Sequence, residues 1–188
     1  MRRKLLLSFL LVFLLTFSHY ILLAQVVINE FMASNTGAIV DPDNQQTADW
    51  IELYNKGNSP VDLSGYHLTD NLKKTTKWEI PAGTQLAANG YLVFWADTTN
   101  SGLHTNFALS ASGEQIGLSD KSGLLIDSVK YGVQDNALSN YGAGAIDVVD
   151  TTLLGIPDAN ISMGRKPDGS NDLLLFTSST PGAPNNTI

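Results

Sequence analysis

The stretch DWIELYNKGNSPVDLSGYHLTD, residues Asp49–Asp70, decides the fold class of this chain. It contains two short alternating segments, Trp50–Asn55 and Gly65–Asp70, with a turn-rich break between them. Alternation with period two indicates strands, because successive side chains of a strand point to opposite faces of the sheet. The stretch therefore predicts two neighbouring strands joined by a loop.

The first of these segments predicts a strand with two unlike faces. Ile51 and Leu53 would point to one face, whereas Trp50, Glu52 and Tyr54 would point to the other. In antiparallel sheets one face commonly packs on the core and the other meets water. We therefore expect this strand to bury one face and leave the other half solvated.

Similar alternation recurs along the chain after residue 25, where helical periodicity is hard to find. The further predicted strands are Val26–Met32, Lys77–Ile80, Tyr91–Ala96, Glu114–Ser119 and Leu124–Tyr131. Turn-forming residues separate them, and Asn89-Gly90 before YLVFWA is the sharpest hairpin signal. Short strands without intervening helices favour an all-β sandwich or barrel.

The first 24 residues have the pattern of a signal peptide. The basic residues Arg2–Lys4 precede the uncharged apolar run Leu5–Phe17, and Ala24 supplies a small residue before the expected cut. Cleavage would leave one domain, residues 25–188, in a secreted or periplasmic protein. The alternative is an N-terminal membrane anchor, because the apolar segment approaches the roughly 20 residues of a membrane span.

Composition excludes several kinds of function. The chain has no cysteine, which rules out disulfides, thiol catalysis and cysteine-bound metals. Loss of the first 24 residues would remove three of the eleven basic residues and none of the eighteen acidic ones, so the formal charge becomes −10. Such a chain repels phosphate backbones, and we expect no nucleic-acid partner.

A series of sequence blocks follows in a characteristic order between about residues 26 and 185. The blocks are INEFMASN (28–35), DWIELYNKG (49–57), VDLSGYHLTD (61–70), WEIPAGTQLAANGYLVFWAD (78–97), HTNFALSASGEQIGL (104–118), LIDSVKYG (125–132), GRKPDGS (164–170) and STPGAPN (179–185). Together they resemble the bacterial lamin-tail domain family. The resemblance implies an immunoglobulin-like β-sandwich, and a non-catalytic module of the kind often attached to secreted or surface enzymes.

One departure from the family pattern lies near the C-terminal third, where residues 133–163 separate VKYG from GRKPDGS. It resembles a long loop insertion, and such loops often carry function. Its apolar pieces stand among aspartates, which suits a hydrophobic contact inside an acidic rim. The candidate contacts to an envelope protein or glycan are Ile146, Val148, Leu153, Leu154 and Ile156. The alternative is that these residues cover a sheet edge.

Acidic residues near the strands have two interpretations. Glu30, Asp49 and Glu52 would suit general acid/base chemistry if two of them met in space. Hydrogen bonds to turn backbone, or a cross-strand pair, are the favoured interpretation because buried charges must be paired.

The loop DPDNQQTAD, residues 41–49, offers a candidate calcium site. Asp41, Asp43 and Asp49 supply hard carboxylate oxygens, which calcium prefers. The spacing lacks the glycine and the terminal glutamate of an EF-hand loop. Solvated turn chemistry is the alternative.

No segment carries a catalytic signature, and no residue is predicted to be catalytic or to hold a cofactor. His67 and His104 belong to no HExxH motif, and no serine lies in GxSxG. We therefore expect a secreted, non-enzymatic binding or structural module. The alternatives are a hydrolase that uses acidic residues with or without a metal, and a carbohydrate-binding module.

The carbohydrate-binding alternative depends on the aromatic residues Tyr66, Trp78, Tyr91 and Trp95. They could form a platform for a sugar ring. Aromatic side chains also bury large areas, and the favoured interpretation is packing in the sandwich.

Overall fold

The computed structural model describes residues 25–132, 145–146 and 159–185 of the chain. Within these ranges the secondary structure consists of strands, and there is no helix long and apolar enough to cross a membrane. In chain order the strands are β1 (Val26–Met32), β2 (Asp49–Asn55), β3 (Val61–Asp62), β4 (His67–Thr69), β5 (Trp78–Glu79), β6 (Gln85–Leu86), β7 (Tyr91–Ala96), β8 (Gly113–Ser119), β9 (Leu125–Gly132), β10 (Ala145–Ile146), β11 (Ser162–Arg165) and β12 (Leu173–Phe176). The all-β prediction is confirmed for these residues.

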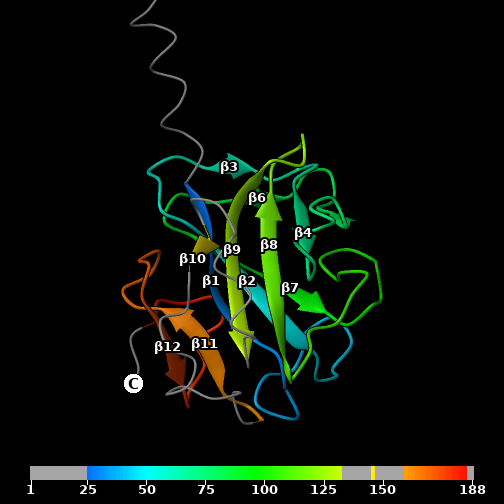
Figure 1. Ribbon diagram of the computed structural model, residues 1–188, viewed down its shortest axis with the longest axis vertical. Helices are drawn as coiled ribbons and strands as arrows, with labels where there is room; N and C mark the ends of the chain where they lie inside the picture. Colours follow the sequence, from blue (N-terminus) through cyan, green and yellow to red (C-terminus); the bar gives the residue numbers. More distant parts are fainter. Residues whose placement is uncertain (1–24, 133–144, 147–158, 186–188) are drawn as a thin grey trace, which may run out of the picture.

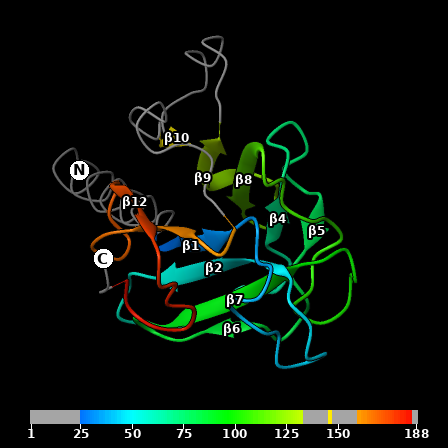
Figure 2. The ribbon, with the colours of Figure 1, turned by 90° about the horizontal axis from the view of Figure 1, so that it is seen from below.

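The strands form two five-stranded sheets and one small two-stranded sheet. The strand order is β12-β11-β1-β2-β7 in the first sheet and β10-β9-β8-β4-β5 in the second, while β3 pairs with β6. All pairs are antiparallel except β10 with β9, which is parallel. Figures 1 and 2 show the two larger sheets as separate layers. This is the predicted β-sandwich.

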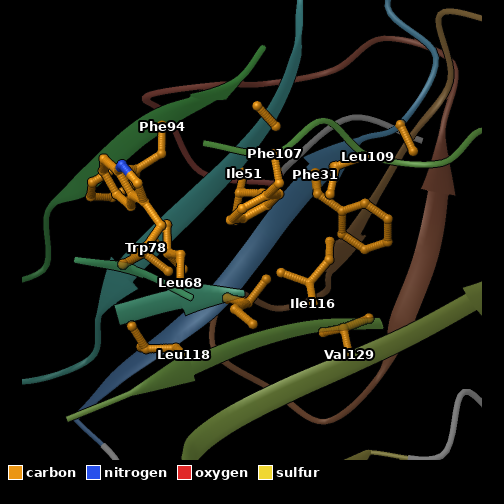
Figure 3. Close-up of a cluster of buried hydrophobic side chains, with 14 of the residues drawn as sticks. Phe31, Ile51, Leu68, Trp78, Phe94, Phe107, Leu109, Ile116, Leu118 and Val129 are labelled. Carbon is orange, nitrogen blue, oxygen red and sulfur yellow. The ribbon is translucent and has the colours of Figure 1, made fainter. Parts of the chain in front are cut away.

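Apolar side chains of both sheets fill the space between the layers (Figure 3). The first sheet contributes Phe31 and Ile51, and the second contributes Ile116, Leu118 and Val129, all of them buried. Burying a side chain of this size stabilises the fold by roughly 1.5–3 kcal/mol. The alternation seen in the sequence therefore corresponds to residues that face the opposite sheet.

The strand predictions are accurate for the long strands, and the short strands β4 and β5 lie within the predicted segments Gly65–Asp70 and Lys77–Ile80. The bounds of β1 and β7 are those predicted, and β2, β8 and β9 differ by one residue. The strands β3, β6, β10, β11 and β12 were not expected. Two-residue strands cannot show period two, and the LLLF segment of β12 is uniformly apolar, so alternation gives no signal there.

The expectation that β2 leaves one face half solvated is wrong. Trp50 and Glu52 lie on the face away from the main core, and both are 0% exposed. Trp50 packs with Met32 and Trp95 in a second apolar cluster, which Ile39 of the β1–β2 loop helps to cover. A backbone donor of the C-terminal segment reaches Glu52. A loop and a chain end thus cover this face, and alternation within one strand cannot reveal such a layer.

The predicted insertion, residues 133–163, extends too far at its C-terminal end. Met163 belongs to β11 and lies opposite Phe31 of β1. The backbone N–H of Asn160 donates to the carbonyl of Ser34 at 2.8 Å. The β-sandwich has therefore resumed at Asn160, because loop and ladder hydrogen bonds connect the chain to β1 and its following loop from there on.

A buried ion pair joins the sheets on the two sides of this segment. The Nη2 atom of Arg165 in β11 donates to both carboxylate oxygens of Asp127 in β9, at 2.9 and 3.0 Å. The Nε atom of Arg165 donates to the carbonyl of Ile28 at 2.6 Å, and the arginine is 1% exposed. Removal of one partner would leave an uncompensated buried charge, so the contact between the two sheets at this ion pair is important for the stability of the sandwich.

Candidate functional site

Two glutamates meet across β1 and β2 beneath the C-terminal segment. Glu30 and Glu52 are opposite each other in the strand register, and both are 0% exposed. Glu30 accepts hydrogen bonds from the hydroxyl of Ser162 and from the backbone N–H and hydroxyl of Thr180, at 3.1 and 2.9 Å for the latter two. Glu52 accepts from the backbone N–H of Gly182 at 2.6 Å. We call Glu30 and Glu52 the glutamate pair.

The glutamate pair matches the structural interpretation of these residues. It is a cross-strand pair, and both members bind turn or chain-end backbone, as expected. Burial raises the pKa of Glu52 to about 8, even though hydrogen bonds from Asn29 and Gly182 lower it. Burial likewise raises the pKa of Glu30. The carboxyl groups are therefore used to hold the C-terminal segment on the first sheet.

Further polar residues extend this network, and sequence analysis did not single them out. Asp168 accepts hydrogen bonds from the Nδ2 of Asn29 at 2.9 Å, the hydroxyl of Tyr91 at 2.8 Å and the backbone N–H of Asn185 at 3.0 Å. The side chain of Asn185 donates to the carbonyl of Arg165 at 2.8 Å. Asp168 belongs to the block GRKPDGS and Asn185 to the block STPGAPN. These two blocks indicated the region, but they did not reveal the hydrogen bonds of the two residues.

A second polar cluster lies where the β1–β2 loop meets the β7–β8 loop. Asp41 and Asp43 come from the first loop and His104 from the second, and one ligand atom from each lies within 4.8 Å of the other two. The Nε2 atom of His104 is 3.7 Å from the Oδ2 of Asp41 and 3.5 Å from the Oδ2 of Asp43. We call Asp41, Asp43 and His104 the loop cluster.

Side-chain to backbone hydrogen bonds build the acidic arm of this cluster. Asn35 accepts from the backbone N–H groups of Ala38 and Ile39 and donates to the carbonyls of Ile39 and Ala48. The Oδ1 of Asp41 accepts from the backbone N–H of Asp43 at 2.9 Å, as in an Asx turn. Short polar residues thus fix the loop conformation locally.

Asp97 orients the histidine of the loop cluster from the end of β7. Its Oδ2 lies 2.8 Å from the Nδ1 of His104. Burial lowers the pKa of His104, but the hydrogen bond and charge of Asp97, with the charge of Asp41, outweigh it and leave the pKa raised. A bridge between Trp95 and His104 sets the histidine backbone beside β7. Only tertiary structure reveals this arrangement, since Asp97 and His104 are distant from Asp41 in the sequence.

The structure places the three predicted calcium ligands in two different surroundings. Asp41 and Asp43 lie together in the loop cluster, whereas Asp49 lies on β2. The Oδ1 of Asp49 accepts a hydrogen bond from the backbone N–H of Asn35 at 3.0 Å, and burial raises its pKa. Calcium binding stays a prediction, but His104, which was not proposed as a ligand, lies where Asp49 was expected.

The predicted aromatic platform is not present as a set of exposed rings. Trp78 and Trp95 are 4% and 6% exposed, and they belong to separate apolar clusters. Tyr91 stacks on Tyr54 with ring centroids 4.7 Å apart. The packing interpretation of the tryptophans is confirmed, because the sandwich and its covering loops enclose both.

The predicted partner contacts fall mostly outside the described residues. Val148, Leu153, Leu154 and Ile156 all lie outside them. The backbone of Ile146 is part of β10 and is in parallel register with Val129 of β9. The pairing of β10 with β9 means that the backbone at Ile146 covers an edge of the second sheet. This agrees with the alternative interpretation of the segment at this one position.

The two packed, mainly antiparallel sheets define the class of immunoglobulin-like β-sandwich domains. A comparison with protein families supports this class, since the Lamin Tail Domain family matches residues 23–133, more than half of the chain. The chain belongs to the Lamin Tail Domain family, whose members are non-catalytic immunoglobulin-like domains. A search of curated proteins found no match. The strands β11 and β12 lie beyond the matched residues and complete the first sheet.

Proposed function

We propose that this chain is an exported, non-enzymatic module that binds a protein or glycan partner in the cell envelope or outside the cell. Family membership supports a structural or binding role. The basic and apolar pattern of residues 1–24 supports export. The acidic composition of the remaining chain argues against nucleic acid as the partner.

The glutamate pair is the observation that carries the non-enzymatic part of this proposal. A general acid or base must reach its substrate, and Glu30 and Glu52 are 0% exposed. Their oxygens accept hydrogen bonds from Ser162, Thr180, Asn29 and Gly182. Carboxylates used in this way support the fold and are not presented to a ligand.

The segment between β9 and β11 is the proposed contact region. In the sequence it combines apolar pieces with several aspartates, a composition that suits an interface core with a polar rim. The strands on either side resemble the common frame of the family, and a common frame cannot distinguish one member's partner from another's. Specificity would therefore come from the segment itself.

Replacement of residues 147–158 by a Gly/Ser linker of equal length tests the contact region. This choice spares β10 and Asn160, whose hydrogen bonds belong to the frame. We expect the variant to keep its unfolding free energy and to lose the partner recovered from envelope extracts with the unmodified chain. As a control, Leu124→Ser removes an apolar side chain that is 56% exposed elsewhere and should keep the partner. A linker variant that aggregates or melts early would show that the segment covers an edge.

A substrate screen tests the rival view that the chain is a hydrolase. We expect no turnover of esters, phosphoesters, glycans or nucleic acids by the purified chain. Turnover that disappears in Glu52→Gln while the fold persists would overturn the non-enzymatic proposal.

A further inference from the structure

The loop cluster combines one imidazole and two carboxylates at a single point between two loops. We propose that Asp41, Asp43 and His104 bind one divalent transition-metal cation of the zinc class. The proposal does not depend on the partner-binding function above. Three observations support it: the distances between the ligand atoms, the buried Oδ2 of Asp41 without a hydrogen-bond partner, and the contact between Asp97 and the Nδ1 of His104.

The separations in the loop cluster suit a small tetrahedral cation. The Nε2 of His104 lies 3.7 Å from Asp41 and 3.5 Å from Asp43. Metal–ligand bonds of about 2.0–2.1 Å at tetrahedral angles hold neighbouring ligand atoms roughly 3.3–3.4 Å apart. The two separations from His104 are therefore within a few tenths of an ångström of the tetrahedral spacing, and all three ligand atoms lie within 4.8 Å of one another. Three protein ligands leave the fourth position to water.

The Oδ2 of Asp41 is an independent sign of a missing ligand. Asp41 is 0% exposed, and this oxygen has no hydrogen-bond partner. Buried carboxylate oxygens are normally satisfied by donors or by metal ions, because their desolvation is unfavourable. The oxygen points to the Nε2 of His104 at a distance too long for a good hydrogen bond. A cation between the two atoms satisfies both.

Asp97 supplies the contact that metal-binding histidines usually have. Its carboxylate lies 2.8 Å from the Nδ1 of His104 and fixes the proton on that nitrogen. In the neutral imidazole with its proton on Nδ1, the lone pair of Nε2 faces Asp41 and Asp43. Asp97 is itself held by the backbone N–H of Thr99 at 2.9 Å. Asp97 is therefore a positioning residue for the metal ligand.

The ligand set distinguishes zinc-class metals from calcium. Calcium takes six to eight oxygen ligands, whereas the imidazole of His104 favours zinc, copper, nickel or iron. Asp49 is occupied by the backbone of Asn35 and does not belong to the cluster. The charge of a divalent cation would balance Asp41 and Asp43 while His104 remains neutral. Binding would tie the β1–β2 loop to the β7–β8 loop.

Metal titration of the chain without a histidine tag tests the site. After treatment with chelator, we expect calorimetry and native mass spectrometry to show one Zn²⁺ per chain and the melting temperature to rise on zinc addition. Cobalt(II) should give the absorption bands of a tetrahedral ion, and millimolar Ca²⁺ should leave the melting temperature unchanged. Absence of stoichiometric zinc binding, or saturation by calcium in place of zinc, would overturn the proposal.

Variants separate this site from adventitious surface binding. The Asp43 side chain is 70% exposed, so Asp43→Asn should fold normally and lose at least tenfold in zinc affinity. His104→Gln should abolish the cobalt bands, and Asp97→Asn should weaken zinc binding 10- to 100-fold with the cobalt bands retained. Asp172→Asn makes the same charge change beside β12, at the other edge of the first sheet, and should bind like the unmodified chain. Unchanged affinity in Asp43→Asn would show that the metal binds elsewhere.

Discussion

The glutamate pair and the loop cluster are both acidic, and both contain fully buried carboxylates, but they differ in their supply of donors. Glu30 receives hydrogen bonds from a strand hydroxyl and from the C-terminal segment. Asp41 has one satisfied oxygen and one oxygen without a hydrogen bond, with His104 beyond it. In the first arrangement donors of the chain satisfy the carboxyl group, whereas in the second one buried oxygen has no hydrogen-bond donor. Two buried acidic groups can therefore differ in whether the chain itself satisfies their oxygens, and this difference motivates the proposed metal site at the loop cluster.

Removal of Glu30 should have the largest effect. Glu30→Ala leaves the buried hydroxyl of Ser162 and the backbone N–H of Thr180 without their acceptor, and we expect the free energy of unfolding to fall by about 3–4 kcal/mol. Urea denaturation measures it. Glu79→Ala, at an exposed position of β5, should change stability by less than about 0.5 kcal/mol. An equal loss of stability in the two variants would mean that the glutamate pair does not stabilise the packing of the C-terminal segment on the first sheet.

The pH dependence of stability should come next in size. The pKa of Glu52 is about 8 in the folded protein against 4.5 in the unfolded chain, so between these values the folded state holds a proton that the unfolded state has released. The contribution of this proton to the free energy of unfolding is therefore fully present below pH 4.5 and is lost as the pH rises through 8. We expect the loss to be about 2 kcal/mol between pH 6 and 8. Urea denaturation with chelator present measures this loss, and Glu52→Gln should flatten the profile. A profile that rises toward pH 8 would contradict the expectation.

Removal of the charge of Asp41 should have a smaller effect than either. Asp41→Asn keeps the oxygen that accepts from Asp43 and removes a buried negative charge that has no hydrogen-bond donor at Oδ2. In metal-free protein we expect the unfolding free energy to change by less than about 1 kcal/mol. A loss as large as that of Glu30→Ala would show that the chain already satisfies Asp41, and the contrast between the clusters would disappear.

Processing of the N-terminus should leave both clusters unaffected. We expect mass spectrometry of the exported protein to find Gln25 as its first residue, because Ala24 precedes the predicted cut. The unfolding free energy should be the same with and without residues 1–24, since none of the described contacts of either cluster includes them. Recovery of the intact chain in the membrane fraction would support the anchor alternative.

Much of the fold could be predicted from local sequence. The alternation in β1, β2 and β7 gave their positions, because residues at every second position face the core. The buried outer face of β2 could not be predicted, since Ile39 and Gly182 reach it from a loop and a chain end. The alternation of apolar residues in a strand indicates which face packs on the core, but it does not indicate which loop or chain end covers the other face.

The residues of the loop cluster could likewise be predicted only in part from the sequence. Asp41 and Asp43 are close in the sequence and could be proposed as ligands, with Asp49 as the third. His104 lies about sixty positions further on and reaches them only because the chain pairs beside Trp95. Asp49, the nearest acidic neighbour, is used to hold the backbone of Asn35. Proximity in the sequence therefore gave two of the three residues of the loop cluster.

The ion pair between Arg165 and Asp127 affects how this β-sandwich tolerates a change in the length of the segment between β9 and β11. It holds β9 and β11 together at the two ends of the intervening segment. Once those ends are fixed, the entropic cost of a flexible connection grows only logarithmically, by about 0.6 kcal/mol for each doubling of its length. The sandwich can therefore accept segments of very different length and composition at this place. The position is a natural point for grafting foreign peptides into the domain.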